Sequence, residues 1–291
     1  MKHILLLPNL DKPKCAAILS EVVKVLSSHQ ASIYMDAGAL ALVPQEGVLP
    51  YFGETEIDLL IVIGGDGSIL DASEFCLERD IPLLGINLGT MGYLADVECE
   101  DIHLLHRLFE GEYLVRELST LSVTHGKENG EIESAHRLAV NEISIMHDSF
   151  QGVADLRFSD GNGGEIDYRC DGLLIATPAG STAYALSAGG PVLDRSAEVI
   201  SVTPVCPHSW FRQTLVYNNN QVFRIKNISK NGNTVYACAD GRLIFSVCTD
   251  EWVEVQVAKS KLKVVTFHNF TTFETLRRKM DKMEAGMHHE E

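Results

Sequence analysis

The sequence predicts an N-terminal domain of the α/β class and a C-terminal domain made mainly of antiparallel β-strands. Three observations lead to this prediction. Over about the first 100 residues, short apolar runs alternate with helical patterns, as in β-α-β units around a parallel sheet. From about residue 114, apolar residues recur at every second position between turn signals, which is typical of antiparallel strands. After residue 268, a last amphipathic helix is expected over about 272–284.

The first two strands are short apolar runs on either side of a helical pattern. The strands are expected over 4–7 and 32–35. Between them a helix is expected over about 12–28, and Pro13 is compatible with its first turn. Apolar residues at helical spacing give this helix a wide buried face, formed by Ile18, Leu19, Val22, Val23, Val25 and Leu26.

The third strand is the clearest element of the sequence. Residues 59–63 form a continuous apolar run rich in β-branched residues, as expected for a strand that is covered on both faces. A glycine loop follows, and a helix is expected from Ser68 to Leu77. A further buried strand over 81–88 leads into a second loop, 89–92, and then a helix over about 101–109. This order of elements predicts a Rossmann-like domain.

The second half has a different character. Alternation is clear over 253–257, and turn signals are present over 160–164 and 231–233. A helical insertion interrupts the strands near 181–187. The last helix carries four large apolar residues, Phe273, Leu276, Met280 and Met283.

These patterns set the expected domain limits. The α/β domain covers 1–113 together with about 269–291, and the β-rich domain covers 114–268. We expect the C-terminal helix to pack back on the N-terminal domain.

Composition limits the function. Twenty-four basic residues against forty acidic ones give a net charge of −16, so the molecule as a whole repels nucleic acid and anionic membranes. A phosphate site must therefore be built locally from backbone N–H groups, a few arginines and a metal ion. Seven scattered cysteines indicate neither a zinc site nor a disulfide framework. With no signal peptide or membrane span in the sequence, we expect a cytoplasmic protein that binds neither nucleic acid nor membrane.

The glycine loop carries the first functional signal. Gly64, Gly65, Asp66, Gly67 and Ser68 lie between the clearest strand and the next helix, at the sheet edge where open α/β folds bind ligands. Glycines let a phosphate approach the backbone, and the helix N-terminus favours an anion. A carboxylate in such a loop would repel phosphate unless it binds a metal or accepts a proton from an attacking hydroxyl, and both are roles in phosphoryl transfer. The alternative is a turn in which Asp66 merely caps the helix.

At these residues the chain resembles the NAD kinase family. That family's diagnostic stretch has Gly-Gly-Asp-Gly, a hydroxyl residue and an apolar pair, and this chain has GGDGSIL. Diacylglycerol and sphingosine kinases share the motif, and phosphofructokinases have a related form. The glycine loop alone therefore indicates a kinase and leaves its acceptor open.

Four further stretches resemble NAD kinases in the same order and at matching separations. The matching segments are 85–89 with 92–94, then Asn141 and Glu142, then 171–172 with 177–184, and finally 203–209. With the β-rich end of the chain included, the resemblance covers nearly the whole sequence.

The resemblance implies roles for particular residues. Asp66 becomes the catalytic base and, with Gly67, contacts NAD, whereas Gly64, Gly65, Gly67 and Ser68 form the phosphate-binding loop. Asn141 and Glu142 would contact the dinucleotide, although the pair by itself could equally be structural. Asp171 would face the nicotinamide end, and Arg169 would lie at the site, from the same or a neighbouring subunit.

For Arg169 and Asp171, spacing also places both side chains on one face of a strand, and the alternative is a surface ion pair worth little. In the segment 177–187, Ser181 is the expected helix cap, with Thr182 and Ala183 in the first turn. By resemblance Thr182, Ala183, Tyr184 and Ser187 line the NAD site. The alternative is a plain strand-loop-helix connection.

Two positions depart from the family pattern. Gly152 stands where many relatives have a basic or histidine side chain. Arg242 follows Asp240 and Gly241 where relatives often have Asp-x-Gln, and it either meets a phosphate or is simply exposed. His288 and His289 are read as part of a disordered terminus.

The resemblance implies Mg²⁺-dependent transfer of a phosphoryl group from ATP, or from polyphosphate, to the 2′-hydroxyl of NAD by a homodimer or homotetramer. Three rivals are weighed against it: a lipid kinase, a kinase resembling phosphofructokinase, and a non-catalytic NAD(H) sensor. The stretch 177–184 separates the chain from lipid kinases. The loop's distance from the chain start separates it from phosphofructokinases, and the intact Asp66, Asn141 and Asp171 oppose a sensor without activity.

Overall fold

The computed structural model describes residues 2–89, 92–127, 129–148, 152–230 and 232–287, the last six of these as backbone only. The chain forms two compact units, Met1–Glu117 with Leu262–Glu291, and Leu118–Lys261. The first unit contains the segments 114–117 and 262–268, which the sequence analysis assigned to the β-rich half. Both segments supply strands to the first unit's sheet.

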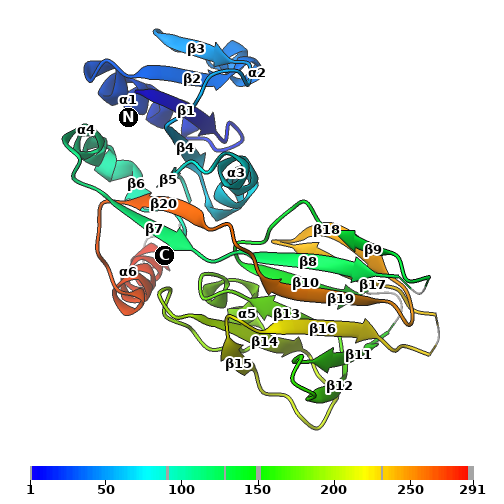
Figure 1. Cartoon of the computed structure of the whole chain (residues 1–291). Coiled ribbons are helices and arrows are strands. Elements are labelled where there is room, and N and C mark those ends of the chain that lie inside the picture. The colour runs from blue at the N-terminus through cyan, green and yellow to red at the C-terminus, as the bar shows by residue number, and fades with distance from the viewer. Residues whose placement is uncertain (1, 90–91, 128, 149–151, 231, 288–291) are drawn as a thin grey trace. The chain divides into compact units, whose positions relative to one another are not determined.

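The first unit is built around an eight-stranded sheet in the order β3-β2-β1-β4-β5-β20-β7, with β6 paired to β5 (Figure 1). Each pairing along β3 to β20 is parallel. The predicted α/β class is thereby confirmed. The strands are β1 His3–Pro8, β2 Ser32–Asp36, β3 Val48–Tyr51, β4 Leu59–Gly64, β5 Leu83–Asn87, β6 Val97–Glu98, β7 Leu114–Leu118 and β20 Leu262–Thr266.

Two helices cover opposite faces of this sheet. Helix α1 (Cys15–Ser28) shares a core with Ile4, Leu6, Ile61 and Ile63. Helix α3 (Asp66–Arg79) packs on the alternate face, where Gly85 permits the close approach because a Cβ there would lie 2.4 Å from Cδ1 of Ile69. The helix that follows β1 therefore lies on one face of the sheet, and the helix that follows β4 lies on the other.

Several elements differ from the predicted ones. Strand β3 and helix α2 (Ala37–Leu42) were missed; α2 has only six residues, all of them Ala, Gly or Leu, so its sequence shows no helical alternation of apolar and polar residues. Helix α1 begins three residues after the predicted start. Helix α3 begins at Asp66 rather than Ser68. The helix predicted over about 101–109 is a 3₁₀ segment, η1 Cys99–His106, followed by α4 Arg107–Glu110.

The C-terminal helix α6 (Thr272–Met287) belongs to the first unit, which confirms that it packs back on this domain. Its contact is partly polar, because the buried Lys279 lies with Nζ 3.9 Å from Oε1 of Glu98. Two of its predicted apolar residues, Phe273 and Met280, are 70% and 54% exposed. In the described part of the chain, no helix is long and apolar enough to cross a membrane.

The second unit consists of two six-stranded antiparallel sheets around one apolar core. One has the order β15-β14-β13-β10-β17-β18 and the other β12-β11-β16-β19-β8-β9. The strands are β8 Leu121–Gly126, β9 Ile132–Ser134, β10 Glu142–His147, β11 Ala154–Ser159, β12 Glu165–Cys170, β13 Gly172–Ala176, β14 Val199–Val205, β15 Leu215–Asn218, β16 Val222–Asn227, β17 Val235–Ala239, β18 Arg242–Val247 and β19 Trp252–Val257.

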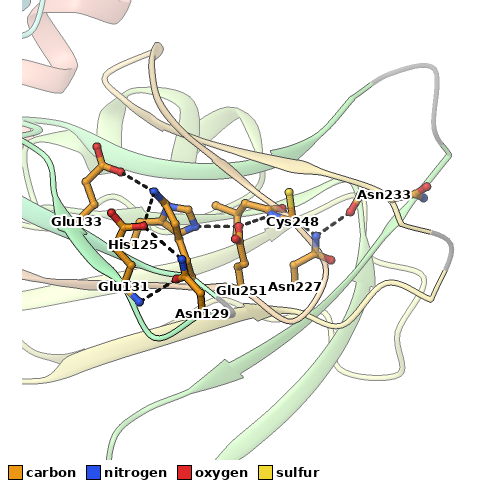
Figure 2. Close-up of polar contacts among 10 residues, drawn as sticks. His125, Asn129, Glu131, Glu133, Asn227, Asn233, Cys248 and Glu251 are labelled. Carbon is orange, nitrogen blue, oxygen red and sulfur yellow. Dashed lines mark hydrogen bonds and ion pairs between the residues drawn. The ribbon is translucent and has the colours of Figure 1, made fainter.

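A polar network fixes one end of this unit (Figure 2). Nε2 of the buried His125 lies 3.0 Å from Oε2 of Glu251, and the same oxygen accepts the Cys248 N–H at 2.8 Å. Asn227, fully buried, donates to the carbonyls of Asn233 and Val247. These bonds supply partners for groups that would otherwise be buried without one, a state that costs about 1–3 kcal/mol per group.

Candidate active site

The glycine loop lies where β4 ends and α3 begins. A Cβ on Gly64 would lie 2.6 Å from Oγ of Ser68, so the loop needs glycine there. Nδ2 of Asn9, the residue after β1, donates to the same Oγ at 2.8 Å. The loops after β1 and β4 thus meet at the carboxyl edge of the sheet, between helices that cover opposite faces. This is the position at which open α/β sheets bind ligands.

Asp66 is the first residue of α3, and its carboxylate turns toward the loop that follows β5. Oδ2 accepts the N–H of Tyr93 at 2.6 Å, and Oδ1 accepts that of Leu94 at 3.0 Å. A Cβ on Gly92 would lie 2.9 Å from Oδ1. The alternative in which Asp66 caps its own helix is therefore wrong. A carboxylate has about four acceptor positions, so two remain for a ligand.

The helix N-terminus beside Asp66 remains available to an anion. Its N-cap residue is Gly65, which has no side chain to bind the N–H groups of the first turn. These groups and the helix dipole favour negative charge at this point. The second loop starts at the buried Asn87, whose Oδ1 accepts the Gly89 N–H at 3.0 Å. Residues 90 and 91 of the loop lie outside the described residues.

A pocket of about 550 Å³ opens beside the glycine loop. It lies in the first unit, on the face of the sheet that α3 covers. Its lining combines apolar residues of β1, β4 and α3 with polar residues that come from α3 and from the ends of strands or the loop after β1: Leu5, Leu7, Pro8, Asn9, Asp11, Asp36, Tyr51, Val62, Ser68, Asp71, Ala72 and Phe75.

In the second unit, Asn141 and Glu142 are held by Asp240. Oδ1 of Asp240 accepts the N–H groups of Asn141 at 2.8 Å and Glu142 at 3.1 Å, and Oδ2 accepts that of Val140 at 2.8 Å. Asp240 and Gly241 form the turn between β17 and β18, with φ of +47° and +77°, as in a type I′ hairpin turn. The hairpin turn thereby positions the Asn-Glu pair.

Glu142 is buried, and its Oε2 has no hydrogen-bond partner among the described residues. Burial first, and the charge of the nearby Asp240 carboxylate second, raise the pKa of this carboxyl from 4.5 to about 7. Burial also raises the pKa of Asp240, against the three backbone N–H groups that lower it. The raised pKa values mean that the fold disfavours the charged form of each carboxyl group.

We expect Glu142→Gln to stabilise the protein at pH 8. The folded state holds the Glu142 proton more tightly than the unfolded chain, so wild-type stability from this group is present below about pH 4.5 and lost as pH rises to about 7. Glutamine has no proton to lose. Urea unfolding should give the variant an advantage on the order of 3 kcal/mol at pH 8, and little at pH 5. An advantage of equal size at both pH values would contradict the assignment.

Asp171 lies at the centre of a second group of side chains in this unit. Nε2 of His147 is 3.4 Å from its Oδ1, and His147 also contacts the Asp148 carbonyl. A hydrogen bond to Asp171 raises the pKa of the exposed Cys206 thiol. Burial, followed by the charges of Cys206, Asp171 and Glu142, raises the pKa of Tyr184. Tyr184 is therefore close enough to Asp171 and to Glu142 to interact electrostatically with each of them.

Arg169 does not share a strand with Asp171 as predicted. Strand β12 ends at Cys170 and β13 begins at Gly172, and these two strands belong to different sheets. Asp171 is the residue at which the chain passes from one sheet to the other, so the spacing argument for a common face fails. Arg169 is exposed; its N–H donates to Oγ of Ser209 at 2.7 Å, and its carbonyl accepts the N–H of His208.

The segment after β13 packs tightly against Asn141. A Cβ on Gly180 would lie 2.1 Å from the Asn141 carbonyl oxygen, so glycine is required there. The predicted helix is a short 3₁₀ segment, η2 Gly180–Thr182, followed by α5 Tyr184–Ser187. Ser181 is not a cap: it is buried, donates to the Pro178 carbonyl and accepts the Leu193 N–H.

The remaining predicted residues of this segment lie at its surface. Thr182 and Ala183 are half-buried, whereas Tyr184 and Ser187 are exposed. Arg242 is exposed at the start of β18, directly after the turn that holds Asn141 and Glu142. Gly152 has φ of +83° and is exposed.

Sequence reasoning missed three residues of this site: His147, Cys206 and Asp240. Asp240 had a readable signal, because Asp-Gly between two alternating segments predicts a hairpin turn. Nothing local indicated that the turn's carboxylate would bind a segment about 100 residues earlier. His147 and Cys206 meet Asp171 only through strand pairing.

These features define a class of protein. A helix N-terminus whose first N–H groups face no capping side chain, with an adjacent carboxylate at the ligand edge of a parallel sheet, is the arrangement expected of a kinase. Residues 4–113 match the model of the ATP-NAD kinase N-terminal domain, and residues 140–267 match that of the ATP-NAD kinase C-terminal domain. The chain belongs to the NAD kinase family.

Curated relatives match along nearly the whole chain. An NAD kinase of Natranaerobius thermophilus is 31% identical over 283 residues, covering 96% of this chain and 98% of the relative. An NAD kinase of Geobacter sulfurreducens is 30% identical over 282 residues, with the same shares covered.

Two solved structures share the fold. Yeast NADH kinase complexed with NADH has a TM-score of 0.84 at 21% identity, over 98% of this chain and 88% of that one. An NAD kinase from Archaeoglobus fulgidus in complex with ATP has a TM-score of 0.70 at 22% identity, over 98% and 99% of the two chains. The predicted combination of an α/β domain with a β-rich domain is confirmed.

Proposed function

We propose that this NAD kinase transfers the terminal phosphoryl group of ATP to the 2′-hydroxyl of the adenosine ribose of NAD by in-line displacement. The observation that carries the mechanism is the position of Asp66. Its carboxylate lies at the N-terminus of α3, held by the N–H groups of Tyr93 and Leu94. An anion bound by the helix N-terminus would thus lie beside a fixed proton acceptor.

In this proposal Asp66 orients the 2′-hydroxyl and accepts its proton as the oxygen attacks the phosphorus. Gly64, Gly65, Gly67 and Ser68 bind phosphate oxygens through backbone N–H groups. Because transfer of this kind involves little covalent chemistry by the protein, positioning and charge stabilisation supply most of the rate.

The second unit supplies the residues proposed to bind NAD. Glu142 offers a buried, unpartnered carboxyl oxygen to a hydroxyl donor, and Asn141 offers an amide beside it. Asp171, Thr182, Ala183, Tyr184 and Ser187 form the rest of this proposed surface, with Arg169 and Arg242 as candidates for contacts to phosphate. The charges of Asp171 and Glu142 both raise the pKa of Tyr184, which supports placing Tyr184 near each of them in the proposed subsite.

A magnesium ion fits this arrangement when it arrives with the donor. Among the described residues, no three His, Cys, Asp or Glu side chains are grouped so as to hold a metal by themselves. Mg²⁺ in phosphoryl transfer needs only one or two carboxylates besides the phosphates. Asp11 and Asp71, which line the pocket with Ser68, would provide them. The ion would neutralise charge on the phosphate oxygens.

The proposal also covers the range of donors, the compartment and the oligomeric state. Inorganic polyphosphate is proposed as an alternative donor. The protein is proposed to be cytoplasmic and to form a homodimer or homotetramer, in which Arg169 would act in its own or a neighbouring site.

A coupled assay tests the function. Purified protein is incubated with NAD, Mg-ATP and an NADP-specific dehydrogenase, and NADPH is followed by absorbance. We expect a signal that requires NAD, the donor and Mg²⁺. Absence of NADPH from folded protein would overturn the proposal, and phosphorylation of a long-chain alcohol or sugar phosphate instead would assign the glycine loop to another acceptor.

A further inference from the structure

We propose that Lys279, on the C-terminal helix α6, is a positioning residue for the reaction. Through Glu98 and Tyr93 it holds the loop after β5 in the place where two backbone N–H groups orient the Asp66 carboxylate. This inference rests on the proposed function, in which that carboxylate accepts the ribose proton. All the residues involved belong to the first unit.

The position of Asp66 depends on the loop after β5. Tyr93 and Leu94 donate their N–H groups to its two carboxylate oxygens, at 2.6 and 3.0 Å. A displacement of the loop would therefore turn or release the group that accepts the proton. Because a misplacement of about 1 Å at a reacting group can lower a rate by about 100-fold, the contacts that fix this loop contribute to the rate.

Asn87, the last residue of β5, fixes the beginning of the loop. It is buried, its Oδ1 accepts the Gly89 N–H at 3.0 Å, and its Nδ2 donates to Oε2 of Glu98 at 3.0 Å. A Cβ on Gly92 would lie 3.4 Å from Oδ1 of Asn87 and 2.9 Å from Oδ1 of Asp66. The Asn87 amide and the Asp66 carboxylate therefore face the same point of the loop, and Glu98 orients that amide.

Lys279 contacts this arrangement at two points. Its Nζ lies 3.9 Å from Oε1 of Glu98, the oxygen next to the one that binds Asn87. The same Nζ lies over the Tyr93 ring, 5.8 Å from its centroid, which is within the range of a cation–π interaction. One cation from α6 thus contacts both the residue that orients Asn87 and a residue that donates to Asp66.

The chain that leads into α6 holds the far end of the loop. Asp96 accepts the Thr266 hydroxyl at 2.5 Å and the Phe267 N–H at 2.7 Å. Both donors lie at the end of β20 or directly after it, before α6 begins. The C-terminal segment therefore contacts the loop near both of its ends, and Lys279 supplies the contact nearer to Tyr93.

Anchoring α6 on the sheet does not by itself explain a lysine at this position. Lys279 is 7% exposed, whereas the apolar Phe273 and Met280 of the same helix are 70% and 54% exposed. Burial of a lysine costs free energy, and a buried ion pair often stabilises a fold no more than apolar residues of similar volume. An apolar side chain would anchor the helix at a lower cost. The buried cation therefore indicates a role in holding the loop.

Lys279→Met tests the assignment, with Arg277→Met as the matched control. The first variant removes the cation and keeps most of the apolar stem, whereas Arg277 is exposed on the same helix. We expect Lys279→Met to lower kcat about 10-fold, with KM for NAD and for Mg-ATP changed less than about threefold. Lys279→Arg, which keeps the charge, should recover most of the rate. Arg277→Met should have the wild-type rate.

A double-mutant cycle with Asp66→Asn separates positioning from general stability. Since Lys279 acts through the Asp66 carboxylate, Lys279→Met should lower the residual rate of Asp66→Asn by less than about twofold. A purely structural role would lower the rate by the same factor in both backgrounds and would overturn the proposal. An unchanged kcat in folded Lys279→Met would overturn it as well.

Amide hydrogen exchange gives a readout that needs no turnover. Exchange at the N–H groups of Tyr93 and Leu94 should be about 10-fold faster in Lys279→Met than in the wild type, and unchanged in Arg277→Met. If the wild type makes no NADPH, faster exchange at these two amides would refute the proposed function and leave the role of Lys279 in holding the loop.

A second variant keeps the proposal testable if Lys279→Met fails to fold. Glu98→Gln keeps an oxygen for the Asn87 bond and loses the charge that faces Lys279. We expect the same lower kcat and faster exchange from it. Wild-type values of both in Glu98→Gln would overturn the proposal.

Discussion

Asp66→Asn is expected to lower kcat by about 100-fold or more, the usual cost of removing a general base, while the fold is retained. Asparagine has nearly the same shape but cannot accept the ribose proton. It keeps one oxygen for the N–H groups of Tyr93 and Leu94, so the loop after β5 loses one of two bonds. Steady-state rates in the coupled assay, with KM values for both substrates, measure the effect.

The control for this variant is Glu78→Gln on the same helix. Glu78 makes an exposed ion pair with Arg79, so its loss removes the same charge without touching the glycine loop. We expect wild-type rates from it. A rate above about one-tenth of wild type for Asp66→Asn, against the 100-fold loss expected for a base, would show that another group accepts the proton.

Asp240→Ala is expected to destabilise the protein by about 3–5 kcal/mol. The substitution removes the acceptor for three consecutive backbone N–H groups, those of Val140, Asn141 and Glu142. It also places alanine at a φ of +47°, a conformation that costs L-residues about 1 kcal/mol. Urea unfolding at pH 7 measures the loss. Because Asn141 and Glu142 would lose their support, KM for NAD should rise in the folded fraction.

Asp240→Asn separates the hydrogen bonds from the charge. Asparagine tolerates positive φ, and one oxygen can still accept the bonds of Asn141 and Glu142. It also removes the charge that helps to raise the pKa of Glu142. We expect a loss of about 1 kcal/mol, because one of the three hydrogen bonds, that of the Val140 N–H, is given up. If Asp240→Ala and Asp240→Asn both lower the free energy of unfolding by only about 1 kcal/mol, the side chain of Asp240 does not hold residues 140–142 in place.

The sequence predicted those parts of the fold that depend on local patterns. The continuous apolar run of β4, the glycine loop and the start of α3 within two residues follow from composition and spacing. Strand β3 was missed because it is a short edge strand containing Pro50, and its burial alternates only weakly. The helix predicted over 101–109 lies where expected, but most of it is a 3₁₀ helix. The spacing of apolar residues does not distinguish a 3₁₀ helix from an α-helix.

The site could be predicted only in part, because local patterns identify motif residues but not the distant residues that bind them. Asp66, Asn141, Glu142 and Asp171 belong to motifs and were named. Their partners come from far along the chain: Tyr93 lies 27 residues from Asp66, and Asp240 lies 98 to 100 residues from the N–H groups it binds. Such pairs depend on strand order and register. The predicted cap at Ser181 was wrong because its hydroxyl instead joins two loop segments.

The order of strands in the first unit has a consequence for how the molecule is made. Strand β20 lies between β5 and β7 in the sheet, although the whole second unit separates it from β7 in the sequence. A ribosome therefore releases every residue of the second unit before the strand that fills this gap emerges. Until then β20 is absent from its place between β5 and β7, and the nascent chain has an incomplete sheet with unpaired backbone groups.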